Sequence, residues 1–195
     1  MADWTVFIWN CPQVKQWLKE LIMKTPPKEG LIAITSMLRF FQTKERKRLD
    51  GMPPEDIMEQ GADFLEDEWS RKFFMTVCGF SRMANHLLEQ NAQEKTIAWL
   101  TWRYPFLEEN EKIRENLPPL IELACHKPNW NITFKRLVAI LSQSERTTMA
   151  EGLVHCLAPD GNLKPLQVDT LEDLLTKLLL SENLAAELIE NRRKG

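Results

Sequence analysis

Glycine is scarce in this sequence, which contains seven among 195 residues. Average usage of about 7% would give roughly twice that number, and glycine most readily adopts the positive φ angles that tight hairpin turns require. No segment shows a convincing strand pattern of alternating apolar and polar residues. The composition therefore disfavours sheets and predicts an all-α protein.

Cysteine is also sparse, and the four cysteines stand far apart, at Cys11, Cys78, Cys125 and Cys156. This spacing lacks both the CxxC pairs of zinc or redox sites and the dense framework of small secreted proteins. The apolar run from Trp4 to Trp9 follows an acid and is too short for a signal peptide. No window approaches the eighteen or so apolar residues that span a bilayer. We expect a soluble cytoplasmic protein that does not enter a membrane.

A strong excess of charge is absent, since the formal net charge is −3 at pH 7. The chain as a whole therefore has no attraction for nucleic acid or anionic lipid, and any such contact must be local. The sequence also lacks a nucleophile elbow, a phosphate-binding glycine loop, an HExxH pair and a dinucleotide fingerprint. These absences predict a protein that is not an enzyme and needs no cofactor.

About ten segments carry apolar residues at helical spacing, separated by prolines near positions 26, 53, 105, 128 and 159. The pattern predicts an irregular multi-helix bundle or a short stack of antiparallel helical pairs. The turn-rich stretch 158–165 divides it into a main helical domain, 1–158, and a C-terminal helical pair, 166–195. We expect that pair either to pack on the main domain or to be tethered by the 158–165 loop.

Several helix boundaries are predicted from single residues. Pro118 and Pro119 are expected to split the segment 108–126 into two helices, and Gly79 to close the helix before a new one at Ser81. Ser144 is expected to open the helix that carries Met149, Leu153, Val154 and Leu157. In the C-terminal pair, Asp169 or Thr170 is the predicted cap of the first helix and Ser181 that of the second.

Tryptophan is abundant, with seven residues where average usage would give far fewer. Trp17, Trp69 and Trp99 lie on apolar stripes and are predicted to fill the core. Tryptophan is also enriched at the energetic centres of protein interfaces. The residues outside the stripes form the predicted protein interface: Trp4, Phe7, Trp9, Trp102 and Arg103.

Two local basic patches could contact phosphate groups. The first comprises Lys44, Arg46, Lys47 and Arg48, and the second is the tail Arg192-Arg193-Lys194. Cations also suit the negative C-terminal end of a helix, so the first patch has a purely structural interpretation. Binding of RNA or DNA through Lys44–Arg48 is therefore the alternative function.

Two mirrored pairs, Cys125-His126 and His155-Cys156, contain the residue types of a Cys2His2 zinc site. Adjacent residues on a helix point about 100° apart, so both pairs would have to lie in turns to converge. The favoured interpretation is no metal site, with packed thiols beside surface or capping histidines. A cysteine nucleophile with a histidine base, oriented by Asp160 or Asn162, is a further alternative.

Taken together, the sequence predicts a non-enzymatic, helical protein-binding module, an adaptor or regulatory subunit of a larger intracellular complex. A protein partner of unknown identity is expected, and the formation of a homo-oligomer is left open.

Overall fold

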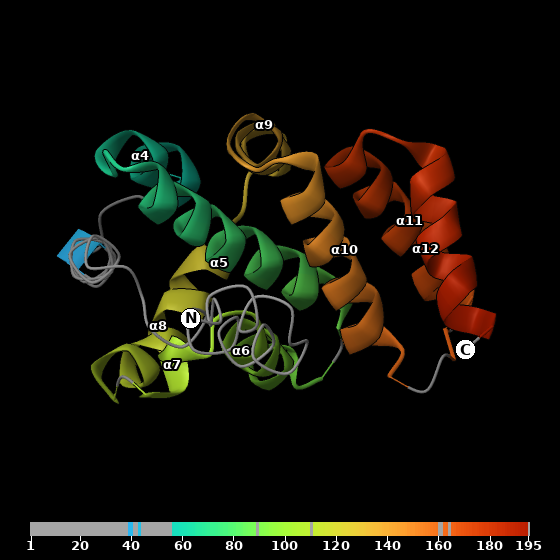
Figure 1. The fold of residues 1–195 in the computed structure, drawn as a ribbon, viewed down its shortest axis with the longest axis horizontal. Coiled ribbons are helices and arrows are strands. Elements are labelled where there is room, and N and C mark those ends of the chain that lie inside the picture. The colour runs from blue at the N-terminus through green and yellow to red at the C-terminus, as the bar shows by residue number, and fades with distance from the viewer. Residues whose placement is uncertain are drawn as a thin grey trace, which may run out of the picture.

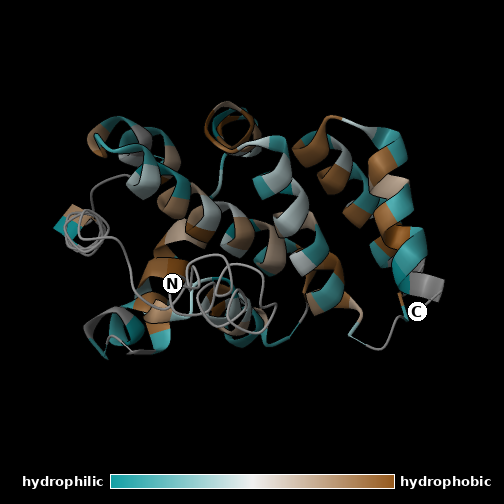
Figure 2. Ribbon diagram, in the orientation of Figure 1, coloured by the Kyte–Doolittle hydropathy of each residue, from teal (hydrophilic) through white to brown (hydrophobic). Residues whose placement is uncertain are grey.

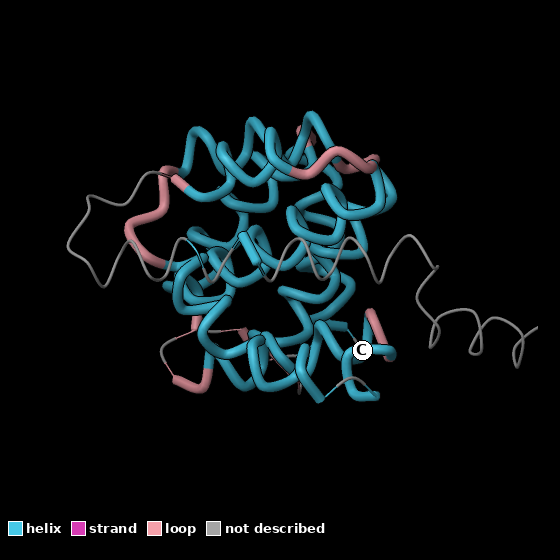
Figure 3. Tube along the Cα trace, turned by 90° about the vertical axis from the view of Figure 1, so that its left-hand side faces the viewer, coloured by secondary structure: helices cyan, strands magenta, loops and turns pink. Residues whose placement is uncertain are grey.

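The fold comes from a computed structural model, which describes residues 39–40, 43, 56–88, 90–109, 111–159, 162–163 and 165–194. Within these residues every regular element is a helix (Figures 1 and 3), which confirms the predicted all-α bundle. The helices are α4 (Ile57–Phe64), α5 (Glu68–Leu87), α6 (Ala92–Arg103), α7 (Phe106–Glu109), α8 (Glu111–Cys125), α9 (Trp130–Ile140), α10 (Gln143–Leu157), α11 (Pro165–Leu179) and α12 (Glu182–Lys194).

Helix α5 is the centre of the bundle, and fourteen of its twenty residues are buried. It packs against α4, α6, α8, α9, α10 and α11 (Figure 1). The predicted helix end at Gly79 is wrong, because α5 continues without a break past Ser81. A Cβ atom on Gly79 would lie 2.6 Å from Cδ2 of Leu137, so the glycine permits the close approach of α9 instead of ending the helix.

Short polar side chains begin several helices. Asp67 accepts a hydrogen bond from the backbone N–H of Ser70 at 2.8 Å, and Ser181 accepts one from Leu184 at 3.3 Å, as predicted. Helix α10 begins two residues earlier than expected, because Ser142 and Glu145 form a capping box. Helix α11 begins at Pro165 and not near Asp169; proline suits a first helical position, where no N–H donor is needed.

Helix α8 runs through both Pro118 and Pro119, so the predicted split there is wrong. An interior proline costs a helix about 3 kcal/mol. Leu117 and Leu120, on either side of the pair, are 1% and 4% exposed, and burying one leucine contributes about 1.5–3 kcal/mol. Packing of the flanking turns into one core therefore offsets the local cost.

Helices α11 and α12 pack against each other, and α11 also contacts α5, α9 and α10. Polar bonds supplement this packing at both ends of α10. Near its start, Nη1 of Arg146 donates to the carbonyl of Leu178 at 2.5 Å. Beyond its end, Nε of Arg192 donates to the carbonyl of Ala158 at 2.7 Å, so this cation of the basic tail serves a contact within the bundle. Among the described residues, no helix has both the length and the apolar character to span a membrane, and hydrophilic residues interrupt the apolar ones along the helices (Figure 2).

A buried ion pair links the elements around α5. Nη2 of Arg82 lies 3.1 Å from Oδ1 of Asp56, and their side chains are 1% and 7% exposed. The same guanidinium donates from Nε to the carbonyl of Ala124 in α8 and from Nη1 to Oγ1 of Thr133 in α9, both at 2.7 Å. One side chain of α5 thus binds groups at the start of α4, in α8 and in α9.

Asp56 makes further bonds of its own. Its Oδ1 accepts from the N–H of Met58 at 2.9 Å, which caps α4. Its Oδ2 accepts from the N–H of Asn129 at 3.0 Å, immediately before α9. These bonds replace the water that both charges lose on burial, which is the condition under which a buried ion pair is tolerated.

Removing the guanidinium should therefore destabilise the fold strongly. We expect Arg82→Met to lower the free energy of unfolding by about 3–5 kcal/mol, because Asp56 is left as a buried charge without its partner. Urea titration followed by circular dichroism measures this loss. The double variant Arg82→Met/Asp56→Asn should recover part of it, since asparagine still caps α4 without a charge. Lys177→Met, which breaks an exposed pair with Asp173, should cost less than about 1 kcal/mol; an equal loss for both single variants would contradict this account.

Candidate functional site

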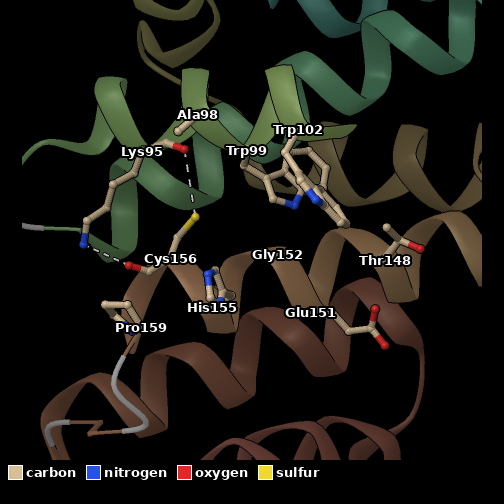
Figure 4. Close-up of a pocket in the computed structure, with 10 residues that line it drawn as sticks. All are labelled: Lys95, Ala98, Trp99, Trp102, Thr148, Glu151, Gly152, His155, Cys156 and Pro159. Atoms are coloured by element: carbon tan, nitrogen blue, oxygen red, sulfur yellow. Dashed lines mark hydrogen bonds between the residues drawn. The ribbon is translucent and has the colours of Figure 1, made fainter. Parts of the chain in front are cut away.

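Helices α6 and α10 border a pocket of about 620 Å³ (Figure 4). Residues from one face of α6 and one face of α10, together with Pro159, line this α6–α10 groove: Lys95, Ala98, Trp99, Trp102, Thr148, Glu151, Gly152, His155 and Cys156. The spacing of three and four residues along each helix places these side chains on a common stripe. The volume falls within the usual range for binding sites, about 300–1,000 Å³.

Trp99 and Gly152 form the inner part of the groove. Trp99 is 6% exposed and stacks on Phe80 of α5, with ring centroids 3.8 Å apart and planes 4° from parallel. A Cβ atom on Gly152 would lie 2.0 Å from Nε1 of Trp99, so only glycine leaves room for the indole at this point of α10. The buried Nε1 has no hydrogen-bond partner within the part of the chain that the structure describes.

Trp102 lies on the same face of α6, close to Trp99 (Figure 4). Its side chain is 68% exposed, which is unusual for so large an apolar group. Two other large apolar residues in the described segments are similarly exposed, Phe64 at 55% and Leu180 at 67%, but neither lines the groove. Phe64 already stacks on Phe40, with centroids 5.4 Å apart. The groove is thus a concave apolar surface with an accessible indole at its rim.

The opposite end of the groove is closed by polar contacts between its two walls. Nζ of Lys95 donates to the carbonyl of Cys156 at 2.9 Å, near the C-terminal end of α10 (Figure 4). The cation is well placed there, because the last carbonyls of a helix carry partial negative charge. The positive charge of Lys95 is therefore engaged in joining α6 to α10.

The remaining predicted interface and core residues are placed as follows. Arg103 follows Trp102, and its guanidinium carbon lies 5.1 Å from the ring centroid of Tyr104. Trp69, predicted to be core, is partly buried and stacks on Phe73 at 5.3 Å. Other predicted residues lie outside the described residues: Trp4, Phe7, Trp9, Trp17, Lys44, Arg46, Lys47, Arg48 and Asp160.

The two Cys-His pairs lie in different pockets. His155 and Cys156 line the α6–α10 groove, whereas Cys125 and His126 line a second pocket of about 320 Å³ between α5, α6 and α8. Helix α6 contributes to both pockets through different faces, so it stands between the pairs. Among the residues that the structure describes, no group of three or more histidines, cysteines, aspartates or glutamates is placed to hold a metal ion. The four-residue zinc alternative therefore does not assemble.

The three described thiols share a burial that disfavours their charged form. Burial raises the pKa of Cys78 far above its usual range, although Arg82 opposes the shift. Burial likewise raises the pKa of Cys125 from an ordinary 9.0 to about 11, and it raises the pKa of Cys156, with Lys95 opposing. Because the thiolate is the nucleophile, these three side chains are poorly reactive at neutral pH.

Sequence reasoning named His155 and Cys156 of the α10 wall only as zinc or nucleophile candidates, and it missed Thr148, Glu151 and Gly152. Gly152 within a helical segment indicates only a weaker helix, and nothing local relates it to Trp99, 53 positions earlier in the sequence. The sequence did carry a signal for the α6 wall, because Trp99 and Trp102 are three residues apart and therefore lie close to one face of a helix.

Comparison of the chain with protein-family models, curated proteins and solved structures finds no match.

The glycine at the groove is open to a direct test. We expect Gly152→Ala to lower the free energy of unfolding by about 1–3 kcal/mol, because the new methyl group would displace the Trp99 indole from its stack on Phe80. Urea titration measures the loss, and tryptophan fluorescence reports the displacement. Glu151→Ala, at the exposed neighbouring position, should change stability by less than about 0.5 kcal/mol. Unchanged stability and emission in Gly152→Ala would contradict the described packing.

The raised thiol pKa values predict a loss of stability in alkali. The unfolded thiols ionise near pH 9 while the folded thiols remain protonated, so stability is full below pH 9 and falls as the pH rises towards the folded-state pKa. Cys125 alone should lower the free energy of unfolding by up to about 1.4 kcal/mol per pH unit between pH 9 and its folded-state pKa of about 11. Urea titrations at several pH values measure this slope. Cys125→Ser, which keeps a donor for the Ser81 carbonyl, should flatten it; identical slopes would refute the assignment.

Proposed function

We propose that this chain is a non-enzymatic protein-binding module whose α6–α10 groove receives an apolar segment of a protein partner. The observation that carries the proposal is the 68% exposure of Trp102 at the rim of that groove. Tryptophan is among the residues that most often dominate binding energy at protein interfaces. Such a module would act as an adaptor or regulatory subunit of a larger intracellular complex.

The energy available from Trp102 is sufficient for an interface anchor. A buried aromatic side chain removes about 150–250 Å² from water, and 68% of that of Trp102 is still exposed. Covering roughly 100–170 Å² more would contribute about 2.5–4 kcal/mol at 25 cal/mol per Å². Part of this gain offsets the entropy of association, so one such anchor needs further contacts around it.

The surroundings of Trp102 supply both rigidity and orientation. The Trp99 stack on Phe80 and the Lys95 bond to α10 hold the walls in place, and a preformed surface loses less entropy on binding. Glu151 and His155 are exposed beside the apolar surface. A polar rim of this kind steers and aligns a partner more than it adds affinity.

The alternative function, binding of RNA or DNA, depends on Lys44, Arg46, Lys47 and Arg48. These residues lie outside the described part of the chain, and no described contact favours that alternative. It remains a distinct outcome of the experiment below, because phosphate binding weakens steeply with salt whereas apolar docking changes little.

The test compares two exposed apolar residues that differ in location. Tagged wild type, Trp102→Ala and Leu180→Ala would be used to purify partners from the source cells with and without nuclease, and affinity for the partner so identified would then be measured. Trp102→Ala should weaken binding at least about tenfold, which corresponds to 1.4 kcal/mol. Leu180, 67% exposed but away from the groove, should tolerate alanine with less than about a twofold change.

Equal binding by both variants would refute the proposed role of the groove. Recovery that depends on nucleic acid, disappears with nuclease and falls steeply with salt would instead support the alternative through Lys44–Arg48.

A further inference from the structure

The second pocket, where α5, α6 and α8 meet, is separate from the α6–α10 groove. Its volume of about 320 Å³ lies near the lower end of the range for small-molecule sites. Polar side chains from all three helices line it, among them Asn85 of α5, Thr96 of α6 and Glu122 of α8. It shares no lining residue with the groove, so its role does not depend on the function proposed above.

Thr96 lines this pocket and carries a hydroxyl group that the fold does not satisfy. The residue is 1% exposed, and its Oγ1 has no hydrogen-bond partner among the residues that the structure describes. A threonine within a helix often donates to the carbonyl four residues earlier, as Thr76 and Thr101 do. Because buried polar side chains nearly always have a partner, the hydroxyl of Thr96 indicates a bond to an occupant of the pocket.

Two helix ends of opposite partial charge border the pocket. Ala92 and Gln93 are the first residues of α6, where the N–H groups have no partner within the helix and the partial charge is positive. Asn91, just before them, makes no side-chain cap. Glu122 and Cys125 lie in the last turn of α8, where the partial charge is negative. A lone anion would be repelled by Glu122 and a lone cation by the start of α6, whereas a ligand with both charges suits both ends.

Hydrogen bonds between the three helices hold the walls of this pocket in position. Nε2 of Gln93 donates to the carbonyl of Pro118 at 3.1 Å, which joins α6 to α8. Sγ of Cys125 donates to the carbonyl of Ser81 at 3.3 Å, which joins α8 to α5. A site whose walls are already fixed loses less entropy when a ligand binds.

We infer that this pocket binds a small zwitterion of the free α-amino acid class. The carboxylate of the ligand accepts hydrogen bonds from the first N–H groups of α6 and from Oγ1 of Thr96. Its ammonium group faces Glu122 and the last turn of α8, where a positive charge is stabilised. The unsatisfied hydroxyl and the two opposed helix ends are thus explained by one ligand.

Two-dimensional ¹H–¹⁵N NMR spectra of the full chain test the site directly. Standard L-amino acids are added one at a time, and the backbone signals are followed. We expect at least one of them to shift the signals of Gln93, Thr96 and Cys125 with a dissociation constant of about 1 mM or lower, while those of Thr148 and Gly152 in the groove stay unchanged. Analogues of that ligand without the amino group or without the carboxylate should each bind at least about tenfold more weakly. No shift with any amino acid, or equal binding of either analogue, would overturn the inference.

A pair of threonine variants tests the role of the hydroxyl. Thr96→Val removes a group that has no partner in the fold, so it should not lower the free energy of unfolding. It should nevertheless weaken amino acid binding at least about tenfold, because a hydrogen bond to a charged group is lost. Thr101→Val is the matched control: its hydroxyl donates to the carbonyl of Ile97 at 2.9 Å and it does not line the pocket, so its affinity should equal that of the wild type. Wild-type affinity in Thr96→Val, or an equal loss in both variants, would contradict the assignment.

Discussion

The burial of one guanidinium constrains the arrangement of the elements around α5. Arg82 is 2% exposed, and a buried charge is tolerated only where partners replace the water it has lost. Those partners lie at Asp56, Ala124 and Thr133, which are 26, 42 and 51 residues away in sequence. The start of α4, the end of α8 and the first turn of α9 must therefore meet at one point of α5 for the charge to be satisfied. The bonds of the Arg82 side chain therefore specify where α4, α8 and α9 lie against α5.

The same central helix sets the width of the α6–α10 groove. Helices α6 and α10 each pack more extensively on α5 than on each other, and Phe80 of α5 provides the surface on which Trp99 stacks. Gly152 lets α10 pass beside that indole, while Lys95 joins the far end of the two walls. A concave surface remains because two helices are held by a third and do not close fully on one another.

Exposure distinguishes two tryptophans that are three residues apart. Trp99 is 6% exposed and contributes to the core, whereas Trp102 is 68% exposed at the rim. An accessible indole beside a preformed apolar surface is the feature on which the proposed protein binding rests. Two indoles on one face of α6 thus lie in different environments, one stacked in the core and one accessible at the rim of the groove.

Local patterns in the sequence determined the helical class, the positions of most described helices and the cap at Ser181. They also distinguished Trp99 as a core residue from Trp102, because the apolar stripe of a helix repeats every three to four residues. The same patterns failed at Gly79 and at Pro118, where a contact with α9 and packing of the flanking turns outweigh the local tendency to end a helix. Only the tertiary structure decided which helix faces meet, and with them the groove, the separation of the Cys-His pairs and the burial of Arg82. The reason is physical: caps and periodicity act over about four residues, whereas a pocket depends on contacts between segments that lie tens of residues apart.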